Sequence, residues 1–405
     1  MSRLPSQREF VAMMALLFAM IALSIDSMLP ALPAIAADLT PLDVNAAQLV
    51  VSSFFFGMGF GTFIAGPMSD AFGRKRVIAA FAVIYVAAAI LCAVAPSLQM
   101  LLLARVIQGI GAAAPRVVGM AMVRDMYKGR EMARIVSFVM TIFMVAPALA
   151  PLMGQGILLL GSWRAIFMAL VVLGVLVNAW VLWRQPETLV AAKRRPLHLG
   201  LLWQAAKELA RHRIALIATL CQTLTSGCLL ATITSQQGIF EETFHRAGTF
   251  PLWFGFIAIC ASGGSFLNSR VVVRLGMRAV IRAAYTVQVG LTLLILGLDA
   301  SGAMPAVLVF PAHILWSIGV FATMGLTMGN LNALAMEDLG HIAGFAASMI
   351  TATSTVLSVL IAVPVGLAFN GTQIPLMVGV AVFSALALAL ILTVKKPPAG
   401  ILVQV

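Results

Sequence analysis

Long apolar runs alternate with short polar connections along the whole chain. The runs are continuous and about 20–28 residues long, the length of a helix that crosses a bilayer, whereas barrel strands are about ten residues long and alternate in polarity. We therefore predict twelve transmembrane helices, close to residues 10–37, 46–69, 77–95, 98–123, 134–160 and 163–183, and then 214–237, 250–273, 279–298, 304–334, 342–369 and 373–394.

One polar connection is much longer than the others and runs from Arg184 to Arg213. It divides the chain into an N-terminal six-helix bundle (1–184), a cytoplasmic linker (185–213) and a C-terminal six-helix bundle (214–405). A trace of repetition survives in the loop after the second span of each half, where Gly73-Arg74 has its counterpart in Gly276-Met-Arg278. The predicted fold class is all-α integral membrane, with two pseudo-symmetric six-helix bundles.

The composition agrees with a membrane protein. Hydrophobic residues make up 61% of the chain, charged residues only 10%, and the mean hydropathy is +1.04. A soluble domain is about a quarter charged, so a water-soluble protein is excluded. The four cysteines lie inside apolar runs without metal-ligand spacing, and we see no catalytic cluster, phosphate loop or attached soluble module. We therefore expect neither a metal site nor an enzyme.

The net charge of +12 does not indicate nucleic acid, because Lys and Arg collect in alternate loops. Such clustering marks the cytoplasmic side of a membrane protein. It predicts that both termini and the linker are cytoplasmic and that the number of spans is even. The basic residues of these loops include Arg74, Lys75, Arg76, Arg124, Lys128, Arg130, Arg134, Arg270, Arg274, Arg278 and Arg282.

Three charged side chains lie well within the predicted spans, Asp26 in the first and Arg105 and Arg116 in the fourth. Each costs about 2.5–3.5 kcal/mol on insertion scales, so we expect each to face an internal cavity and to have a partner. Arg105 and Arg116 are about three helical turns apart and lie on nearly the same face. We predict that Asp26 pairs with Arg105 and that Arg116 lies deeper in the cavity; a pair of Asp26 with Arg116 is the alternative.

The second half has no charge of this kind, because the position equivalent to Asp26 is Leu229. Its one titratable side chain inside a span is His313. A hydrogen-bonded packing role is the commoner explanation of a lone histidine. We nevertheless keep His313 as a cavity residue and as the second candidate for proton coupling.

The loop after the second span reads Gly66-Pro-Met-Ser-Asp70-Ala-Phe-Gly73-Arg74-Lys75-Arg76. It resembles the signature G-x-x-x-D-R-x-G-R-K/R of the major facilitator superfamily, except at Ala71. Glycine here permits close helix approach or a positive φ. Asp70 can cap a helix or pair with a neighbouring Arg, and so latch the cytoplasmic side; a solvated residue that serves only topology is the alternative.

Four further segments resemble the twelve-span bacterial drug:proton antiporters of the Bcr/CflA-like branch. They are Asp26-Ser-Met-Leu-Pro-Ala-Leu-Pro33, Arg105-Val-Ile-Gln-Gly-Ile-Gly-Ala112, Val123-Arg-Asp125 and Ala146-Pro147-Ala-Leu-Ala-Pro151-Leu-Met-Gly154, the last with Ala in place of the usual first glycines. The resemblance covers the whole chain and is most specific in the first half.

The resemblance implies proton coupling by Asp26 and Arg105, and a bacterial inner-membrane location. Pro147 and Pro151 break the hydrogen bonds of the fifth helix and are expected to bend it, with a plain kink as the alternative. The residues assigned to conformational gating are Gly66, Asp70, Gly73, Arg74, Arg124, Asp125, Pro147, Pro151 and Gly154.

The spans are rich in Met and Phe, with 23 of each in the chain. Flexible Met and broad aromatic faces suit a cavity that accepts varied lipophilic ligands, although lipid-facing and packing roles explain most of them. The residues assigned to the substrate cavity are Asp26, Arg116, Phe56, Met140, Phe143, Met144, Phe254 and His313.

These features predict a monomeric, proton-coupled exporter of lipophilic or amphipathic small molecules that works by alternating access. We expect no cofactor, with the proton gradient as energy source, and small-molecule substrate, protons and membrane lipid as the only partners. The alternatives are an exporter of one endogenous metabolite, such as a sugar, siderophore or amino-acid derivative, or an importer of an organic anion clamped by Arg116. A membrane enzyme or sensor is a third class, and it lacks the residues it needs.

Overall fold

The computed structural model of the protein describes residues 5–194, 199–337, 339 and 343–394. Within this part of the chain twelve helical segments are long and apolar enough to cross a membrane, and no strand occurs. The predicted all-α fold with twelve spans is confirmed. The spans of the first half are α1 (Gln7–Asp26) with η1 (Leu29–Ala31) and α2 (Leu32–Leu39), η2 (Val44–Gln48) with α3 (Leu49–Phe72), α4 (Arg74–Ala93), α5 (Leu98–Met126), α6 (Gly129–Leu160) and α7 (Trp163–Arg184).

The second half follows the same plan. Its spans are α9 (Arg213–Gly238) with the π-helical turn η4 (Ile239–Thr243), η5 (Ala247–Thr249) with α10 (Phe250–Leu275), α11 (Met277–Ala300), α12 (Ala306–Ala335), α13 (Ala343–Leu367) and α14 (Ile374–Leu392). Between the halves lie η3 (Ala191–Lys193) and α8 (Leu199–Arg211). Residues 395–405 of the predicted second bundle lie outside the described residues.

Equivalent helices pack together in the two halves. In the first half α3 packs on α5, α4 on α5 and α7, and α1 on α6. The equivalent contacts in the second half join α10 to α12, α11 to α12 and α14, and α9 to α13. The halves therefore repeat one three-dimensional pattern, as expected for a duplicated transporter fold.

Glycines bring α3 and α5 into close contact. A methyl group at Gly57 would overlap the backbone of Val106, and one at Gly109 would overlap the carbonyl oxygen of Phe54. A methyl group at Gly61 would lie 2.6 Å from the carbonyl oxygen of Ile110. Small residues drive helix association in lipid because backbones can then approach and gain van der Waals contact. The close contact with α3 thus holds α5, the helix that carries Arg105, in place.

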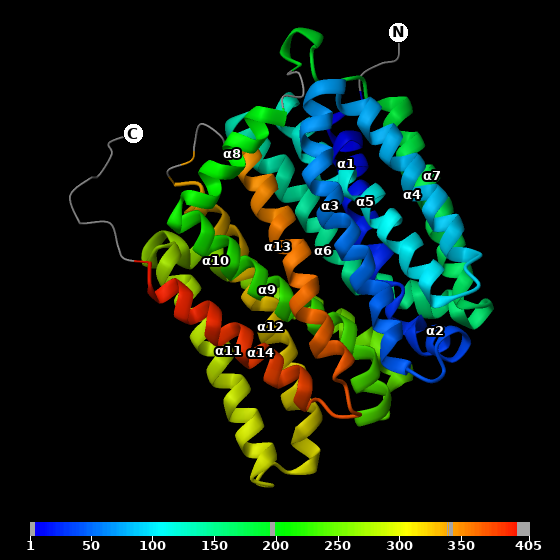
Figure 1. Cartoon of the computed structure of the whole chain (residues 1–405), viewed down its shortest axis with the longest axis vertical. Helices are drawn as coiled ribbons and strands as arrows, with labels where there is room; N and C mark the ends of the chain where they lie inside the picture. Colours follow the sequence, from blue (N-terminus) through cyan, green and yellow to red (C-terminus); the bar gives the residue numbers. More distant parts are fainter. Residues whose placement is uncertain (1–4, 195–198, 338, 340–342, 395–405) are drawn as a thin grey trace.

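The two halves meet at two helix pairs, α3 with α13 and α6 with α10 (Figure 1). Contact between α3 and α13 extends along much of both helices, because methyl groups at Gly59 and Gly66 would lie 2.6 Å from Val356 and 3.7 Å from Ser348. On the α6–α10 side, a methyl group at Gly255 would lie 3.1 Å from the carbonyl oxygen of Ala148.

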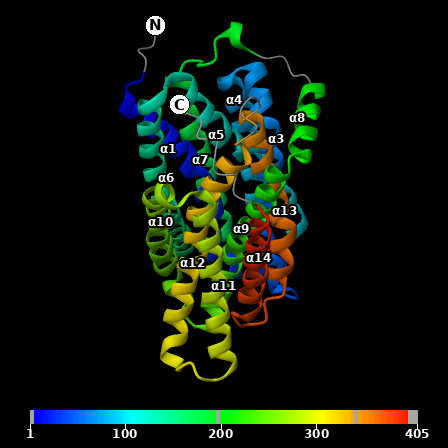
Figure 2. The ribbon, with the colours of Figure 1, turned by 90° about the vertical axis from the view of Figure 1, so that its left-hand side faces the viewer.

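The first residues of α1 lie toward the same end of the molecule as α8, which we call the linker end (Figure 1). Figure 2 shows α11 and α12 extending as a hairpin past the other helices at the opposite end. The short segments α2 and η2 also lie toward that opposite end (Figure 1). We call it the clasp end, for the hydrogen bonds described below.

Because α3 and α5 are in close contact, a larger side chain between them is predicted to lower the stability of the protein. Replacing Gly109 by Val places side-chain atoms against the carbonyl of Phe54, and overpacking of this kind costs about 1–3 kcal/mol. We expect a lower melting temperature of the purified protein. The matched control is Gly290→Val on α11, where nothing lies within 4 Å of the added Cβ; equal melting temperatures for the two variants would contradict the tight α3–α5 contact.

Candidate functional site

Asp26 lies at a break in the first span. It is the last residue of α1, and the chain continues through a turn into η1 and α2. In a continuous helix the N–H of residue 30 would donate to the carbonyl of Asp26 and that of residue 33 to the carbonyl of Leu29. Pro30 and Pro33 have no N–H, so both bonds are missing. The sequence therefore interrupts the helix at Asp26, a carboxylate that lies well inside a span. Interrupted helices commonly form the binding sites of transporters.

The Asp26 side chain is buried, with 5% of its surface exposed, and it makes no hydrogen bond or ion pair within the described residues. The predicted ion pair between Asp26 and Arg105 is therefore wrong for this structure. The alternative pair with Arg116 is not formed either. The carboxyl group stands among apolar neighbours of the same segment, such as Ile25 and Met28.

Arg105 is fully buried and binds to neutral oxygens instead of a carboxylate. Its guanidinium donates to the carbonyl of Val50 (3.0 Å), the carbonyl of Ser24 (3.1 Å) and Oε1 of Gln108 (2.8 Å). It also lies over the ring of Phe54, 4.4 Å from the ring centroid. These contacts join α1, α3 and α5, so Arg105 positions the helix that carries Asp26 without neutralising it.

A second hydrogen bond supports this arrangement. Ser24 Oγ and the Tyr85 hydroxyl lie 2.6 Å apart, which ties α1 to α4 within the last turn of α1, just before the break. An equivalent pair occurs in the second half, where Thr225 Oγ1 and the Tyr285 hydroxyl are also 2.6 Å apart. The duplication is therefore visible in polar contacts that sequence comparison of the two halves did not reveal.

Arg116 is exposed, although it lies in the middle of a span. A methyl group at Gly119, one turn away, would contact Phe18 of α1, and one at Gly61 of α3 would contact Ala113 on the other side of Arg116. Arg116 therefore projects from α5 between α1 and α3. It makes no hydrogen bond or ion pair with any described residue, so its cation is available to a ligand.

The proline motif of α6 packs directly on the break at Asp26. A methyl group at Gly154 would overlap the carbonyl of Ser27, the residue after Asp26. The helix continues through Pro147 and Pro151, which leave the carbonyls of Phe143 and Pro147 without helical donors. On another face α6 contacts α10 at Ala148. The motif thus connects the Asp26 segment to the opposite half.

The structure divides the predicted cavity residues into two groups. Phe56, Met140, Phe143 and Met144 are half-buried, and Phe143 packs near Ala19 and Ala22 of α1. Phe254 and His313 are instead buried in the core of the second half, with 2% and 0% exposure. Phe254 packs against Phe250 and Phe321, and His313 packs against Phe240 and Trp316, so these two side chains are covered by aromatic neighbours in this closed structure.

The signature loop forms a charged cluster at the linker end. Arg74 is buried, and its Nε donates to Oδ2 of Asp125 (2.9 Å), while Nη1 donates to Ser69 Oγ (2.7 Å) and to Asp70. The Asp70 side chain is half exposed, whereas that of Asp125 is 20% exposed. Asp70 therefore pairs with a neighbouring Arg, which was one of the two predicted roles.

Glu187 of the linker takes the other predicted role, that of helix cap. Its Oε1 and Oε2 accept the N–H groups of Arg74 (3.0 Å) and Lys75 (3.1 Å), the first residues of α4. A carboxylate is favourable there because the N-terminus of a helix has free donors and a positive dipole. Thr188 also donates to Asp125 (3.0 Å). Sequence reasoning missed Glu187; its signal is an acid placed just after a span in an otherwise basic linker.

Three other gating residues behave differently from one another. Gly73 has φ 99°, which favours glycine and lets α3 and α4 meet in a tight turn. Gly66 has room for a methyl group, so the predicted need for close approach does not apply there. Arg124 is exposed and takes no part in the Arg74 cluster, unlike its neighbour Asp125.

Hydrogen bonds join the two halves at the clasp end. Asn45 Nδ2 donates to the carbonyls of Leu367 (3.1 Å) and Phe369 (2.8 Å), and Gln48 Nε2 donates to that of Gly366 (3.1 Å). On the α6–α10 side, Gln155 donates to the carbonyl of Gly248 (3.2 Å). We call the Asn45 and Gln48 bonds the clasp.

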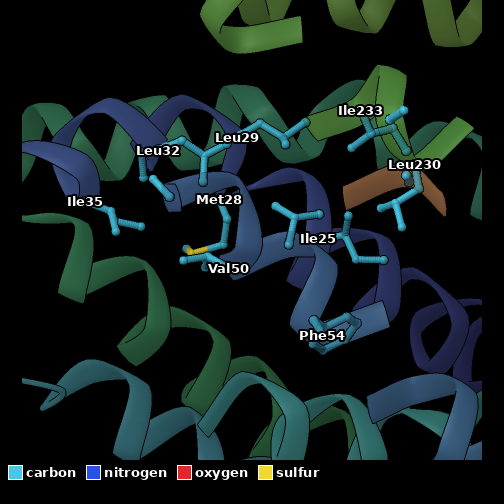
Figure 3. Packing of buried hydrophobic residues seen from close by; sticks show 14 of the residues in the cluster. Ile25, Met28, Leu29, Leu32, Ile35, Val50, Phe54, Leu230 and Ile233 are labelled. Carbon is cyan, nitrogen blue, oxygen red and sulfur yellow. The ribbon is translucent and has the colours of Figure 1, made fainter. Parts of the chain in front are cut away.

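An apolar layer lies beside the clasp and seals the same end. Figure 3 shows Met28, Leu29 and Leu32 of the broken first span in one buried cluster with Leu230 and Ile233 of α9. Ile35, Val50 and Phe54 extend this cluster into the first half (Figure 3). The structure is therefore closed at the clasp end. Sequence reasoning missed the clasp, although Asn and Gln at the start of an apolar run are a recognisable signal.

The contact of α6 with the break predicts that the effect of an added methyl group on transport depends on its position along α6. Gly154→Ala places a methyl group against the carbonyl of Ser27, so α6 must move away from Asp26 and transport should fall strongly at unchanged expression. Gly156→Ala is the matched control, because nothing lies within 4 Å of its added Cβ. Similar substrate flux in both variants, measured in proteoliposomes, would show that the α6–α1 contact is dispensable.

Comparison with known proteins agrees with this architecture. The sequence model of the Major Facilitator Superfamily matches residues 14–363. The chain is 29% identical over 370 residues to the uncharacterized MFS-type transporter YdgK of Bacillus subtilis, covering 90% of each chain. It is 29% identical over 352 residues to the bicyclomycin resistance protein homolog of Haemophilus influenzae, covering 84% of each. It is 33% identical over 248 residues to the multidrug resistance protein MdtL of Klebsiella pneumoniae, covering 60% of this chain and 61% of the relative.

Among solved structures, the D-xylose-proton symporter has the same fold. It superposes with a TM-score of 0.73 at 14% sequence identity, covering 95% of this chain and 96% of the symporter. The residues matched by the family model include the signature loop at the linker end and the break in the first span. The chain belongs to the Major Facilitator Superfamily, and it is a multi-pass membrane transporter rather than an enzyme.

Proposed function

We propose that this transporter is a proton-coupled exporter of lipophilic or amphipathic small molecules, a drug:proton antiporter that works by alternating access. Two relatives are named for resistance to bicyclomycin and to multiple drugs, which supports export of toxic compounds.

The observation that carries the proposal is the state of Asp26. It is buried at a helix break, and no cation of the described residues pairs with it. Burial without a counter-charge disfavours an ionised carboxyl group, so the closed site holds a proton on Asp26. When the halves move and water or the Arg116 cation reaches the carboxyl group, the proton is released. One group then binds a proton in one state and releases it in another, which is what coupling requires.

Alternating access needs closures that can open at each end. The clasp and the apolar layer beside it close one end and connect the halves with few hydrogen bonds. At the linker end, the Arg74 cluster joins α3, α4, α5 and the linker within one half. Rocking of one bundle against the other would break the clasp while the Arg74 cluster keeps its internal contacts.

Arg116 bears on the choice of substrate. It is exposed between α1 and α3, and no carboxylate in the described part of the chain pairs with it, so the site carries an uncompensated positive charge whenever Asp26 is protonated. Like-charge repulsion is strong where water is scarce. The site therefore disfavours dications and accepts neutral or anionic amphiphiles between Arg116 and the half-buried Phe and Met side chains.

The proposed location is the inner membrane of a bacterium, with the linker end in the cytoplasm and the clasp end outside. The chain acts as a monomer and needs no cofactor, because the proton gradient supplies the energy. The support for this orientation is the basic loops at the linker end, with Arg74, Lys75 and Arg76 among them.

The orientation predicts the outcome of reporter fusions. A reporter joined after Val190 or after Val405 should report a cytoplasmic location, and one inserted in the 301–304 loop of the α11–α12 hairpin should report an external one. The reason is the excess of Lys and Arg in loops at the linker end. An external signal from the Val190 fusion would reverse the orientation and leave the fold untouched.

The coupling role predicts a specific defect. Asp26→Asn keeps the size and hydrogen-bonding capacity of the side chain but cannot ionise. We expect flux driven by a pH gradient to fall to the level of empty proteoliposomes, while substrate binding and passive exchange persist. Asp299→Asn, a partly exposed acid at the end of α11, is the control and should transport normally. Uphill transport that survives in Asp26→Asn would refute the proposal that Asp26 carries the proton.

A further inference from the structure

The two helix pairs that join the halves are not closed to the same extent. Between α3 and α13 the contact continues toward the linker end, where a methyl group at Gly66 would lie 3.7 Å from Ser348. No residue of α13 between 345 and 359 is exposed, although this range covers more than half of the helix. The α3–α13 pair is therefore closed along most of its length.

Between α6 and α10 the close contacts lie near the clasp end. A methyl group at Gly255 would lie 3.1 Å from the carbonyl oxygen of Ala148, and Gln155 donates to the carbonyl of Gly248 (3.2 Å). Residues three, four and seven positions apart share one face of a helix. The faces that carry Ala148 and Gly255 can therefore be followed from this contact toward the linker end.

Toward the linker end these two facing surfaces are open. The face of α6 that carries Ala148 continues through Met144, Thr141, Ser137 and Arg134. The face of α10 that carries Gly255 continues through Ile259, Ser262, Phe266 and Ser269. Met144 and Ser262 are half-buried and the others are exposed. The α6–α10 pair is thus closed near the clasp end and open toward the linker end, and we call this gap the side opening.

Hydroxyl groups line both walls of the side opening. Ser137 and Thr141 on α6 donate to the carbonyls of Ala133 and Ser137, and Ser262 and Ser269 on α10 donate to carbonyls one turn back in their own helix. A hydroxyl whose donor is satisfied in this way can face lipid. It can still accept a hydrogen bond from a ligand. The walls therefore suit a molecule with both apolar and polar parts.

Each wall also carries an arginine stacked on an exposed aromatic ring. The Arg134 guanidinium lies 5.7 Å from the ring centroid of Phe138 on α6, and that of Arg270 lies 4.4 Å from the ring centroid of Phe266 on α10. No acid compensates them in these helices, because α10 has no acidic residue and Glu131 of α6 accepts a hydrogen bond from α1. Basic pockets between spans bind anionic head groups, so this mouth suits an anionic amphiphile.

The side opening leads toward Asp26. Met144 is half-buried at its inner edge, and the neighbouring Phe143 packs in one cluster with Ala22 of α1. Ala22 lies one turn before Asp26 in the same helix. A molecule that passes between α6 and α10 therefore reaches the break in the first span without crossing the clasp.

We propose that amphiphiles with an anionic head group enter the transporter from the membrane through the side opening. The head group binds between Arg134 and Arg270, and the apolar part passes the hydroxyl-lined walls toward Phe143 and Asp26. This inference rests on the proposed export function and names its substrate class, which is an anionic amphiphile dissolved in the half of the membrane nearest the linker end. The exposed cation of Arg116 agrees with that sign of charge.

The test is photolabelling of the purified full-length protein in nanodiscs, without a proton gradient. The probe is an alkyl sulfonate that carries a diazirine in the middle of its chain. Mass spectrometry should find label at Met140 and Phe143 inside the opening, as well as at exposed lipid-facing residues of α11 such as Val287 and Leu294. Label on α11 without label at Met140 and Phe143 would overturn the proposal.

Filling the side opening tests the route. Thr141→Trp combined with Ser262→Trp should abolish label at Phe143 and leave the labelling of α11 unchanged. Ser137→Trp, one turn nearer the linker end, is a second variant with the same expected loss. Thr286→Trp is the matched control, because this threonine is exposed on α11, and it should label as wild type does. Undiminished label at Phe143 in the filled variants would mean another route and would overturn the proposal.

The charge of the mouth is tested with a second probe, the uncharged alcohol that corresponds to the sulfonate. Arg134→Gln combined with Arg270→Gln should reduce labelling of Phe143 by the sulfonate and not by the alcohol. Equal labelling by both probes in wild type would overturn the anionic head group. Because labelling needs neither flux nor a titrating carboxyl group, these results leave the antiport proposal standing, and uphill transport by Asp26→Asn would leave the side opening standing.

Discussion

Burial of the Arg105 guanidinium without a counter-ion is the constraint on which the first half depends. A cation inside a bilayer-spanning bundle must have its donors satisfied by the protein. Arg105 achieves this with carbonyls of Ser24 and Val50 and the amide of Gln108. These oxygens belong to three different helices, so α1 and α3 can occupy only one register against α5.

That register has a consequence for Asp26. Ser24 binds Arg105 through its carbonyl and Tyr85 through its hydroxyl, which holds the last turn of α1 in place just before the break. Pro30 and Pro33 interrupt the helix beyond it, and Gly154 of α6 packs against Ser27. A rigid support on one side and a helix interruption on the other leave the carboxyl group at the point where the first span can most easily change shape. Asp26, the proposed coupling residue, is thus positioned by neutral contacts rather than by an opposite charge.

Much of the fold could be predicted from sequence because lipid imposes a simple rule on apolar run length. Twelve runs became twelve spans, and Gly73 has the positive φ that its signature indicated. The partners of Arg105 could not be predicted, because they are backbone carbonyls, which every residue carries. Intramembrane charge singled out Asp26 and Arg116 but wrongly implied that opposite charges must pair.

The second half was harder to interpret for a related reason. Phe254 and His313 have residue types that suit a ligand cavity, yet aromatic packing around Phe240 buries both. Type alone does not tell which face of a uniformly apolar helix points inward. Glu187, Asn45 and Gln48 were missed because each acts across a large sequence separation on main-chain groups.

The clasp is chemically one-sided. All its donors are side chains of the first half, at Asn45 and Gln48, and all its acceptors are main-chain oxygens of the second. Residues 366–369 can therefore drift in side-chain identity without losing the bond, provided the backbone keeps its path. A single substitution in the first half can remove the bond outright. Selection for altered opening at this end would consequently change side chains of the first half and would not require changes in the second half.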